Sequence, residues 1–175
     1  MKQITEQEWE TIKENLWTDF LQNASAEEIH KSVMTSNWDD CKTLLKFITD
    51  NPEKIDKATA LLAYWKSQPD WFKKFENEQD YINKEGYNLF LYHFLEKVEH
   101  HFSQNNYTQS IMYFDPKSCE FYKEIRNEAI LNLIPEIMKQ STGNQYVEYP
   151  EDFEDGLPFP IAQKLFYLLD EYEIM

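Results

Sequence analysis

Two sets of side chains have types and spacings that could support chemistry. The stretch Asn37-Trp38-Asp39-Asp40 places two adjacent carboxylates before an apolar run, and paired carboxylates can transfer protons or hold a divalent metal. Adjacent positions on a helix point about 100° apart, so Asp39 and Asp40 do not converge on one atom. We therefore favour a helix start, in which Asn37 or Asp39 accepts hydrogen bonds from free backbone N–H groups.

The second set is His93, Glu96 and His100, which lie at positions i, i+3 and i+7 of an expected helix. That spacing brings the three side chains to one helical face, where they could bind zinc and support a metal-dependent hydrolase. The apolar stripe of the same helix centres on Phe94 and Val98, on another side. The interpretation that we favour is a solvated face, with no metal and no cofactor.

Other kinds of catalysis find no support in the sequence. Neither Cys41 nor Cys119 stands in a recognisable active-site pattern, no serine does so, and no glycine-rich loop exists to hold a phosphate. The single arginine, Arg126, offers little for bidentate binding of anions. We expect that the protein is not an enzyme.

Composition limits the class of fold and of partner. The chain of 175 residues has 17 basic and 32 acidic side chains, which give a formal charge of −15. Nucleic acid and anionic membranes would be repelled, and a cationic protein would be attracted, unless the acidity serves only solubility. Only 3 glycines occur against 7 prolines, which favours helices over tightly turned strands. No run approaches the ~20 apolar residues of a membrane span, the N-terminus is polar, and two cysteines suit reduced thiols, so we predict a cytoplasmic protein.

Apolar residues recur at helical spacing along most of the chain. The sequence predicts an all-α fold, a single domain over 1–175 that forms an array of about six or seven helices with one long acidic loop. Helices are expected over Thr5–Leu21, from Ser25, over Asp40–Asp50, from Asp56, over Tyr87–Phe102, from Lys117 to Leu133 and over Ile161–Tyr172. Asp70 is expected to cap a further helical turn. Ile111–Phe114 is expected to form a short strand or a buried connector, and the loop is expected at Ser141–Pro160.

Four motifs within this pattern carry a resemblance. The letters NWDD, LLKFITDNP, DKATALLAYW and QPDWF follow one another between about residues 30 and 80. This part of the chain resembles a small bacterial domain family of unknown function. The resemblance implies a compact helical core and a bacterial origin, and it brings no catalytic or ligand residues.

The acidic loop is the candidate binding site. Within the letters YVEYPEDFEDGLPFP, carboxylates alternate with aromatic rings and no basic residue intervenes. The residues that we expect to contact a partner are Glu148, Tyr149, Glu151, Asp152, Phe153, Glu154 and Asp155. A solvated surface loop is the other interpretation. Carboxylates would steer a basic partner, and aromatic rings would supply contact area.

Acidity, small size and the lack of catalytic patterns favour a binding protein. The chain has a general likeness to small acidic immunity proteins, which implies that it neutralises a cognate bacterial toxin, a basic one of the nuclease type. The alternative is a helical adaptor or scaffold protein that docks through its central helix pair. The sequence leaves the identity of the toxin and the oligomeric state open.

Overall fold

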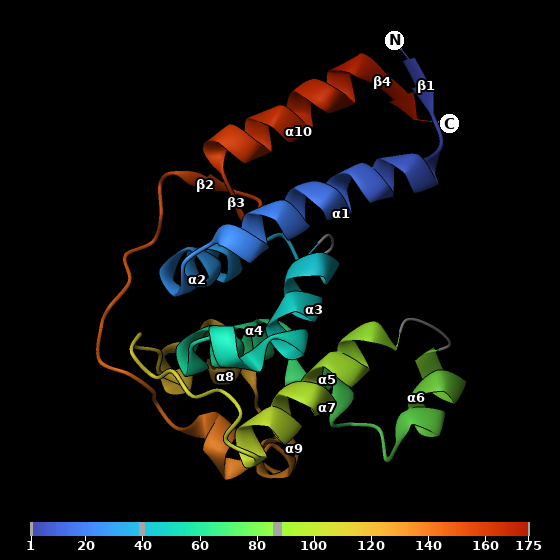
Figure 1. Ribbon diagram of the computed structural model, residues 1–175. Coiled ribbons are helices and arrows are strands. Elements are labelled where there is room, and N and C mark those ends of the chain that lie inside the picture. The colour runs from blue at the N-terminus through green and yellow to red at the C-terminus, as the bar shows by residue number, and fades with distance from the viewer. Residues whose placement is uncertain (1, 39–40, 86–88, 175) are drawn as a thin grey trace. The chain divides into compact units, whose positions relative to one another are not determined.

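The computed structural model describes residues 2–38, 41–85 and 89–174 (Figure 1). The expected helix start at Asp39 and Asp40 lies outside these residues and stays a prediction. The chain divides into two compact units, one formed by Met1–Phe47 with Glu148–Met175 and the other by Ile48–Val147. We call them the terminal unit and the central unit. The prediction of a single domain stays a prediction.

The terminal unit is built mainly from three helices. They are α1 (Glu6–Asn23), α2 (Ala26–Thr35) and α10 (Phe159–Glu171), and α3 (Lys42–Asp50) begins here and ends in the central unit. Thr5 caps α1 in a capping box with Glu8, and Ser25 caps α2 in a capping box with Glu28. Both predicted helix starts are confirmed.

Two short strand pairs complete the terminal unit. Strand β1 (Lys2–Ile4) pairs in parallel with β4 (Tyr172–Ile174), which joins the two ends of the chain. Strands β2 (Phe153–Glu154) and β3 (Leu157–Pro158) form an antiparallel hairpin. Figure 1 shows α1 in blue and α10 in red-orange running in opposite directions along each other.

The central unit is built around one buried helix. The buried helix is α4 (Lys57–Lys66), in which seven of the ten side chains are buried. The surrounding elements are η1 (Pro52–Lys54), α5 (Pro69–Phe72), α6 (Glu78–Glu85), α7 (Phe90–Ser103), η2 (Pro116–Ser118), α8 (Glu120–Glu124), α9 (Glu128–Leu133) and η3 (Glu136–Lys139). The α4 side chains are mostly Ala, Leu, Tyr and Trp, and the small ones allow the close approach of α7 and α8.

Buried polar contacts fix the loops of the central unit onto α4. Asp56 is 1% exposed and caps α4 through Ala58 N, and its other oxygen accepts from Ile111 N at 2.6 Å and Met112 N at 3.3 Å. The indole of Trp65 donates to the carbonyl of Met138 at 2.8 Å. A single carboxylate therefore holds a segment 55 residues further along the chain.

The expected fold class is right in outline and wrong in detail. The described residues are mostly helical, but they form ten α-helices instead of six or seven, and they include two two-stranded sheets. The helix expected from Lys117 to Leu133 is broken, because Ile125 and Asn127 take extended backbone angles. Asp70 does not cap α5, since Gln68 occupies that position in a left-handed conformation with φ of 53°.

The expected loop at Ser141–Pro160 contains the β2–β3 hairpin. The connector at Ile111–Phe114 forms isolated bridges in which Met112 faces Gln145 and Phe114 faces Thr142. Among the helices of the described residues, none has the length and the apolar character required to cross a membrane.

Candidate protein-binding surface

The hairpin holds two of the predicted acidic residues, Glu154 and Asp155, in fixed positions. Asp155 and Gly156 have φ values of 49° and 83°, and they join β2 to β3 in a two-residue turn of the kind that Asp-Gly favours. A Cβ atom on Gly156 would lie 2.8 Å from Cη2 of Trp17 and would clash with the hydroxyl of Ser36. The turn is therefore pressed against α1 and the end of α2, which fixes where Glu154 and Asp155 lie.

The structure separates the predicted contact residues into two groups. Phe153 is 8% exposed, and its ring packs edge-on against Phe20 with centroids 6.3 Å apart, so it belongs to the core of the terminal unit and not to its surface. Tyr149 is 67% exposed. The carboxylate residues of the predicted set are all exposed, namely Glu148, Glu151, Asp152, Glu154 and Asp155.

A pocket of about 200 Å³ brings the hairpin tip together with both long helices. Glu154 and Asp155 line it from the hairpin, and apolar side chains line it from α1 and α10. We call it the Trp17 pocket, and its other lining residues are Trp9, Lys13, Trp17, Asn37, Leu157, Ala162, Leu165, Phe166 and Leu169. The ammonium of Lys13 lies 2.8 Å from the carboxylate of Glu10, which offsets its charge.

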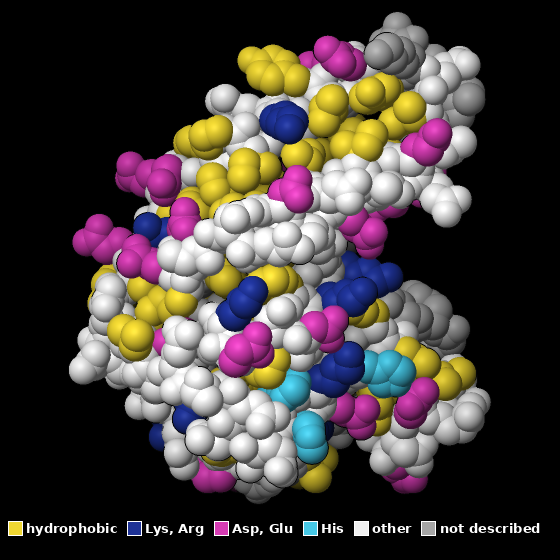
Figure 2. All heavy atoms as spheres, viewed as in Figure 1, with side chains coloured by type: hydrophobic (Ala, Val, Ile, Leu, Met, Phe, Trp, Pro, Cys, Tyr) yellow, Lys and Arg dark blue, Asp and Glu magenta, His cyan; other side chains and the backbone are white. Residues whose placement is uncertain are grey.

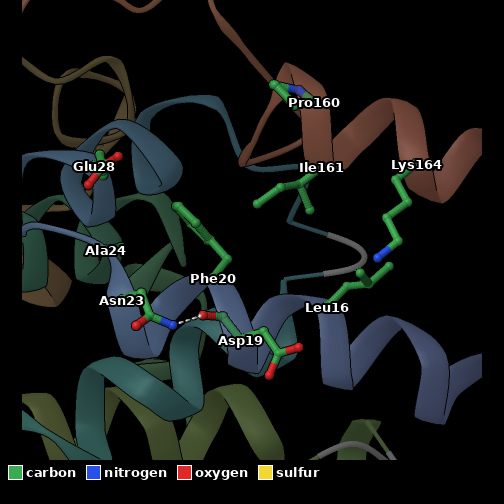
Figure 3. A pocket seen from close by; sticks show the side chains of 9 residues that line it. All are labelled: Leu16, Asp19, Phe20, Asn23, Ala24, Glu28, Pro160, Ile161 and Lys164. Carbon is green, nitrogen blue, oxygen red and sulfur yellow. Dashed lines mark hydrogen bonds between the residues drawn. The ribbon is translucent and has the colours of Figure 1, made fainter.

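A second pocket, of about 420 Å³, opens elsewhere between α1 and α10. We call it the Phe20 pocket, and it is lined by Leu16, Asp19, Phe20, Asn23, Ala24, Glu28, Pro160, Ile161 and Lys164. Figure 3 shows Phe20 from α1 and Ile161 from α10 extending into the space between the helices, with Lys164 reaching toward Leu16. The amide of Asn23 donates to the backbone carbonyl of Asp19 at 2.8 Å, which fixes one edge of the opening.

Helix α10 leaves most of its apolar side chains partly open to solvent. Ala162 is its one fully buried residue in the described chain. Tyr167 is 70% exposed, and Phe159, Phe166 and Leu169 are each about 40% exposed. Figure 2 shows hydrophobic side chains gathered over α1 and α10, with acidic side chains around them. We call the two pockets, the exposed side of α10 and the hairpin tip together the α1–α10 surface.

Sequence reasoning missed this surface, although a signal was present. The helix expected over Ile161–Tyr172 contains the apolar residues Ile161, Leu165, Leu168 and Leu169, and Phe166 and Tyr167 lie beside them on the same helix. A helix that is apolar on most of its circumference has more apolar area than one contact with α1 can bury. That excess is what predicts exposed apolar groups.

Charge is distributed unevenly between the two units. The terminal unit has 6 basic and 17 acidic side chains, a net charge of −11, whereas the central unit has 11 basic and 15 acidic side chains, a net charge of −4. No hydrogen bond or ion pair is recorded for the side chains of Glu148, Glu151, Glu154 and Asp155 in the part of the chain that the structure describes. These carboxylates are available to a partner.

Some acidic side chains of the terminal unit are already engaged. The carboxylate of Glu28 accepts from the backbone N–H and the hydroxyl of Ser25 at 2.7 and 2.8 Å, and these bonds lower its pKa. The pKa of Lys31 is raised, first by its hydrogen bond to Glu27 and to a lesser degree by the charges of Glu27, Asp152 and Glu28. Lys31 therefore offsets part of the charge near Asp152 and leaves the hairpin tip negative.

The histidine set is not brought together. His93 Nε2 lies 3.2 Å from the carboxylate of Glu78 on α6, and His93, Glu96 and His100 are all exposed. Within the described residues, no three His, Cys, Asp or Glu side chains are placed to hold one metal ion.

Comparison with protein families identifies part of the chain. Residues 24–103 match the family described as Domain of unknown function (DUF4274). The match confirms the resemblance to a domain family of unknown function, and it runs from the residue before Ser25 to the end of α7. Most of the α1–α10 surface, including α1, the hairpin and α10, lies outside the matched residues. No curated protein and no solved structure matches the chain.

Proposed function

We propose that this protein is an immunity protein that binds a cognate basic toxin through the α1–α10 surface and acts without catalysis. The observation that carries the proposal is the coincidence, in one unit, of a net charge of −11 with exposed apolar side chains on α10. Carboxylates around an apolar centre match a partner whose binding groove is cationic, as in nucleases.

The Trp17 pocket supplies a specific anchor point in this proposal. Its walls are mainly apolar, the ammonium of Lys13 is paired with Glu10, and Glu154 and Asp155 line the pocket from a rigid turn. A lysine or arginine side chain of the toxin fits this arrangement, because its aliphatic stem packs on apolar rings while its charge meets a carboxylate. Phe166 lines the pocket, and the exposed rings of Tyr149 and Tyr167 supply further contact area on the same unit.

The first test is protection in cells. A basic protein encoded beside this chain, or copurified with it, should stop growth when expressed alone, and coexpression of this chain should restore growth. Purified together, the two proteins should form a complex in which the toxin's activity is blocked. A copurifying protein that has no toxic activity, and that binds with moderate affinity to the central unit, would favour the adaptor alternative.

The second test assigns the surface. Replacing Glu151, Asp152, Glu154 and Asp155 by their amides should slow association roughly 10-fold at low salt and flatten its salt dependence. The matched control replaces four exposed carboxylates of the central unit, Glu53, Glu120, Glu124 and Glu128, by Gln. If both quadruple variants slow association equally, the field of the whole chain attracts the partner and the hairpin has no special role.

The apolar part of the surface should act on the lifetime of the complex. Tyr149→Ala and Phe166→Ala each remove a partly exposed ring, and we expect dissociation to become roughly 10-fold faster with little change in association. The control is Tyr146→Ala, because Tyr146 is 74% exposed and belongs to the central unit. Unchanged dissociation in both variants would place the interface elsewhere.

A further inference from the structure

The central unit contains a pocket with a different chemistry. A space of about 270 Å³ lies between α7 and the segment around α5, and it is lined by three aromatic rings, two carboxylates and aliphatic side chains. The residues that matter here are Phe72, Phe75 and Tyr92 with Glu76 and Glu96. The pocket lies wholly within the central unit, so it is independent of the proposed function.

The rings of Phe72 and Tyr92 form a corner. Their centroids are 6.4 Å apart and their planes meet at 65°. Tyr81 is 7% exposed, and its ring contacts the rings of Phe72, Phe75 and Tyr92 with centroids 5.6, 5.1 and 5.6 Å away. Two rings at this angle and spacing allow one cation to lie within about 6 Å of both centroids, the range of cation–π attraction.

The charges around the corner favour a cation. Glu76 and Glu96 are exposed, and in the described parts of the chain neither side chain has a recorded basic partner. The pKa of Tyr92 is raised, first by its removal from solvent and then by the charges of Glu96, Glu78 and Glu99. The hydroxyl of Tyr92 therefore lies in a negative field.

The basic side chain that lines the same pocket does not cancel this field. Lys73 Nζ lies 2.8 and 2.9 Å from the two carboxylate oxygens of Glu99. The same Glu99 accepts a hydrogen bond from the buried hydroxyl of Tyr64 at 2.6 Å, which keeps the pair in place. The charge of Lys73 is thus matched by Glu99, and the charges of Glu76 and Glu96 remain.

We propose that this pocket binds an organic cation with a quaternary ammonium head group. Such a head group has no hydrogen-bond donor, so it is recognised by ring faces and by nearby carboxylates rather than by ion pairs with defined hydrogen bonds. The volume of about 270 Å³ is below the ~300 Å³ at which pockets for drug-sized ligands begin, which suits a head group of this size.

The test compares two probes of nearly the same shape, choline and its neutral carbon analogue 3,3-dimethyl-1-butanol, titrated into the full chain and followed by NMR shifts or calorimetry. We expect the cation to bind about 5-fold more tightly or better, the ratio that corresponds to ~1 kcal/mol of cation–π attraction. Equal affinity for both probes would show an apolar pocket without cation recognition. No saturable binding of the cation would overturn the proposal.

Variants locate the site. Glu96→Gln and Glu76→Gln should each weaken binding of the cation several-fold and leave the affinity for the neutral probe unchanged. Tyr92→Leu should remove the preference for the cation over the neutral probe. Glu96 is exposed, so its replacement does not endanger folding. The matched control is Glu120→Gln, which removes the same charge from the central unit outside the pocket. If Glu120→Gln weakens binding of the cation as much as Glu96→Gln does, the effect comes from net charge and the pocket is not the binding site.

Discussion

In the terminal unit an acidic hairpin and the apolar side of α10 face solvent, whereas in the central unit buried polar groups are paired around α4. Tyr149 and Tyr167 of the terminal unit are more than two thirds exposed. In the central unit Asp56 is buried with three backbone N–H partners, and Glu99 joins Tyr64 to Lys73. The same chain therefore contains a buried polar network in one unit and an exposed acidic and apolar surface in the other.

This contrast has a physical reason in the connections between the elements. Helix α10 is apolar on most of its circumference, and it keeps Phe159, Phe166 and Leu169 about 40% exposed. The central unit has a long connection from α7 to η2, and the buried carboxylate of Asp56 fixes it by accepting hydrogen bonds from Ile111 and Met112. Backbone N–H groups in such a connection need an acceptor, because no helix supplies one.

The largest effect is expected for Gly143→Ala in the central unit. Gly143 has φ of 64°, and a Cβ atom there would clash with the backbone carbonyl of Met112 and lie 2.8 Å from that of Ile111. Backbone cannot move aside as a side chain can, so we expect a loss of more than about 3 kcal/mol in the free energy of unfolding. Hydrogen exchange measured by mass spectrometry should show lost protection in the central unit.

The counterpart is Gly156→Ala in the terminal unit, where the clashes are mainly with the side chains of Ser36 and Trp17. We expect a smaller loss, with protection reduced in α1 and α2. If either variant lowers protection equally in both units, the units unfold together, and the prediction of a single cooperative domain gains support over a division into two.

The next largest effect is expected for Asp56→Ala. The variant leaves the N–H groups of Ala58, Ile111 and Met112 without their acceptor, and we expect a loss of about 2–3 kcal/mol. Thermal or urea unfolding measures it. Asp70→Ala is the matched control, because Asp70 lies in the first turn of a helix and caps nothing. Equal losses would mean that the hydrogen bonds from Ile111 and Met112 to Asp56 contribute little to the free energy of unfolding.

Local signals in the sequence predicted the helix starts well. Thr5, Ser25 and Asp56 all cap the helices that were expected to follow them. The second role of Asp56, its bonds to Ile111 and Met112, could not be predicted, because it depends on a segment far along the chain. A helix cap depends on residues that are neighbours in the sequence, whereas a hydrogen bond to a distant loop depends on how the whole chain folds.

The candidate site was predicted in part for the same reason. The five acidic residues of the loop are exposed, as their density indicated. The Asp-Gly pair was a visible hairpin signal, and the loop was nevertheless expected to be irregular. Phe153 was expected at the surface, and only the packing against Phe20 shows that it lies in the core. Alternation of acidic and aromatic residues does not reveal which ring turns inward.

A smaller difference between the units should appear at high pH. Burial raises the pKa of Tyr107. Burial is also the largest cause that raises the pKa of Tyr64, and the charge of Glu99 and the hydrogen bond to Glu99 raise it further. A raised folded pKa means that stability is fully present below the unfolded value near 10 and is lost as pH rises above it. The described tyrosines of the terminal unit, Tyr149, Tyr167 and Tyr172, are not buried.

The central unit should therefore lose protection first as the pH rises above about 10. Urea unfolding at several alkaline pH values, with hydrogen exchange to locate the change, measures the slope of stability against pH. Tyr107→Phe should reduce that slope, while Tyr167→Phe, in the terminal unit, should leave it unchanged. A steeper loss in the terminal unit would contradict the assignment.

The smallest effect is expected at low pH, where the terminal unit has its own sensitive group. The pKa of Glu28 is lowered from its ordinary value of 4.5, first by the hydrogen bond from the backbone of Ser25 and then by the hydroxyl of the same residue. A lowered folded pKa means that the stabilisation is fully present above pH about 4.5 and is lost as pH falls through the folded value.

Glu28→Gln keeps a side chain that can complete the capping box without a charge. The stability of this variant should therefore fall less than that of the unaltered protein between neutral and acid pH. Ser25→Ala should instead lower stability by about 1 kcal/mol at neutral pH, because the acceptor for the N–H of Glu28 is lost, and it should only reduce the acid sensitivity, because the backbone N–H at this position still donates to the carboxylate of Glu28. The control is Glu14→Gln, which removes the same charge from an exposed position of α1 and so corrects for relief of repulsion within this acidic unit. If Glu14→Gln and Glu28→Gln change the acid dependence of α2 protection equally, the effect belongs to net charge and the capping box contributes nothing to the acid response of the terminal unit.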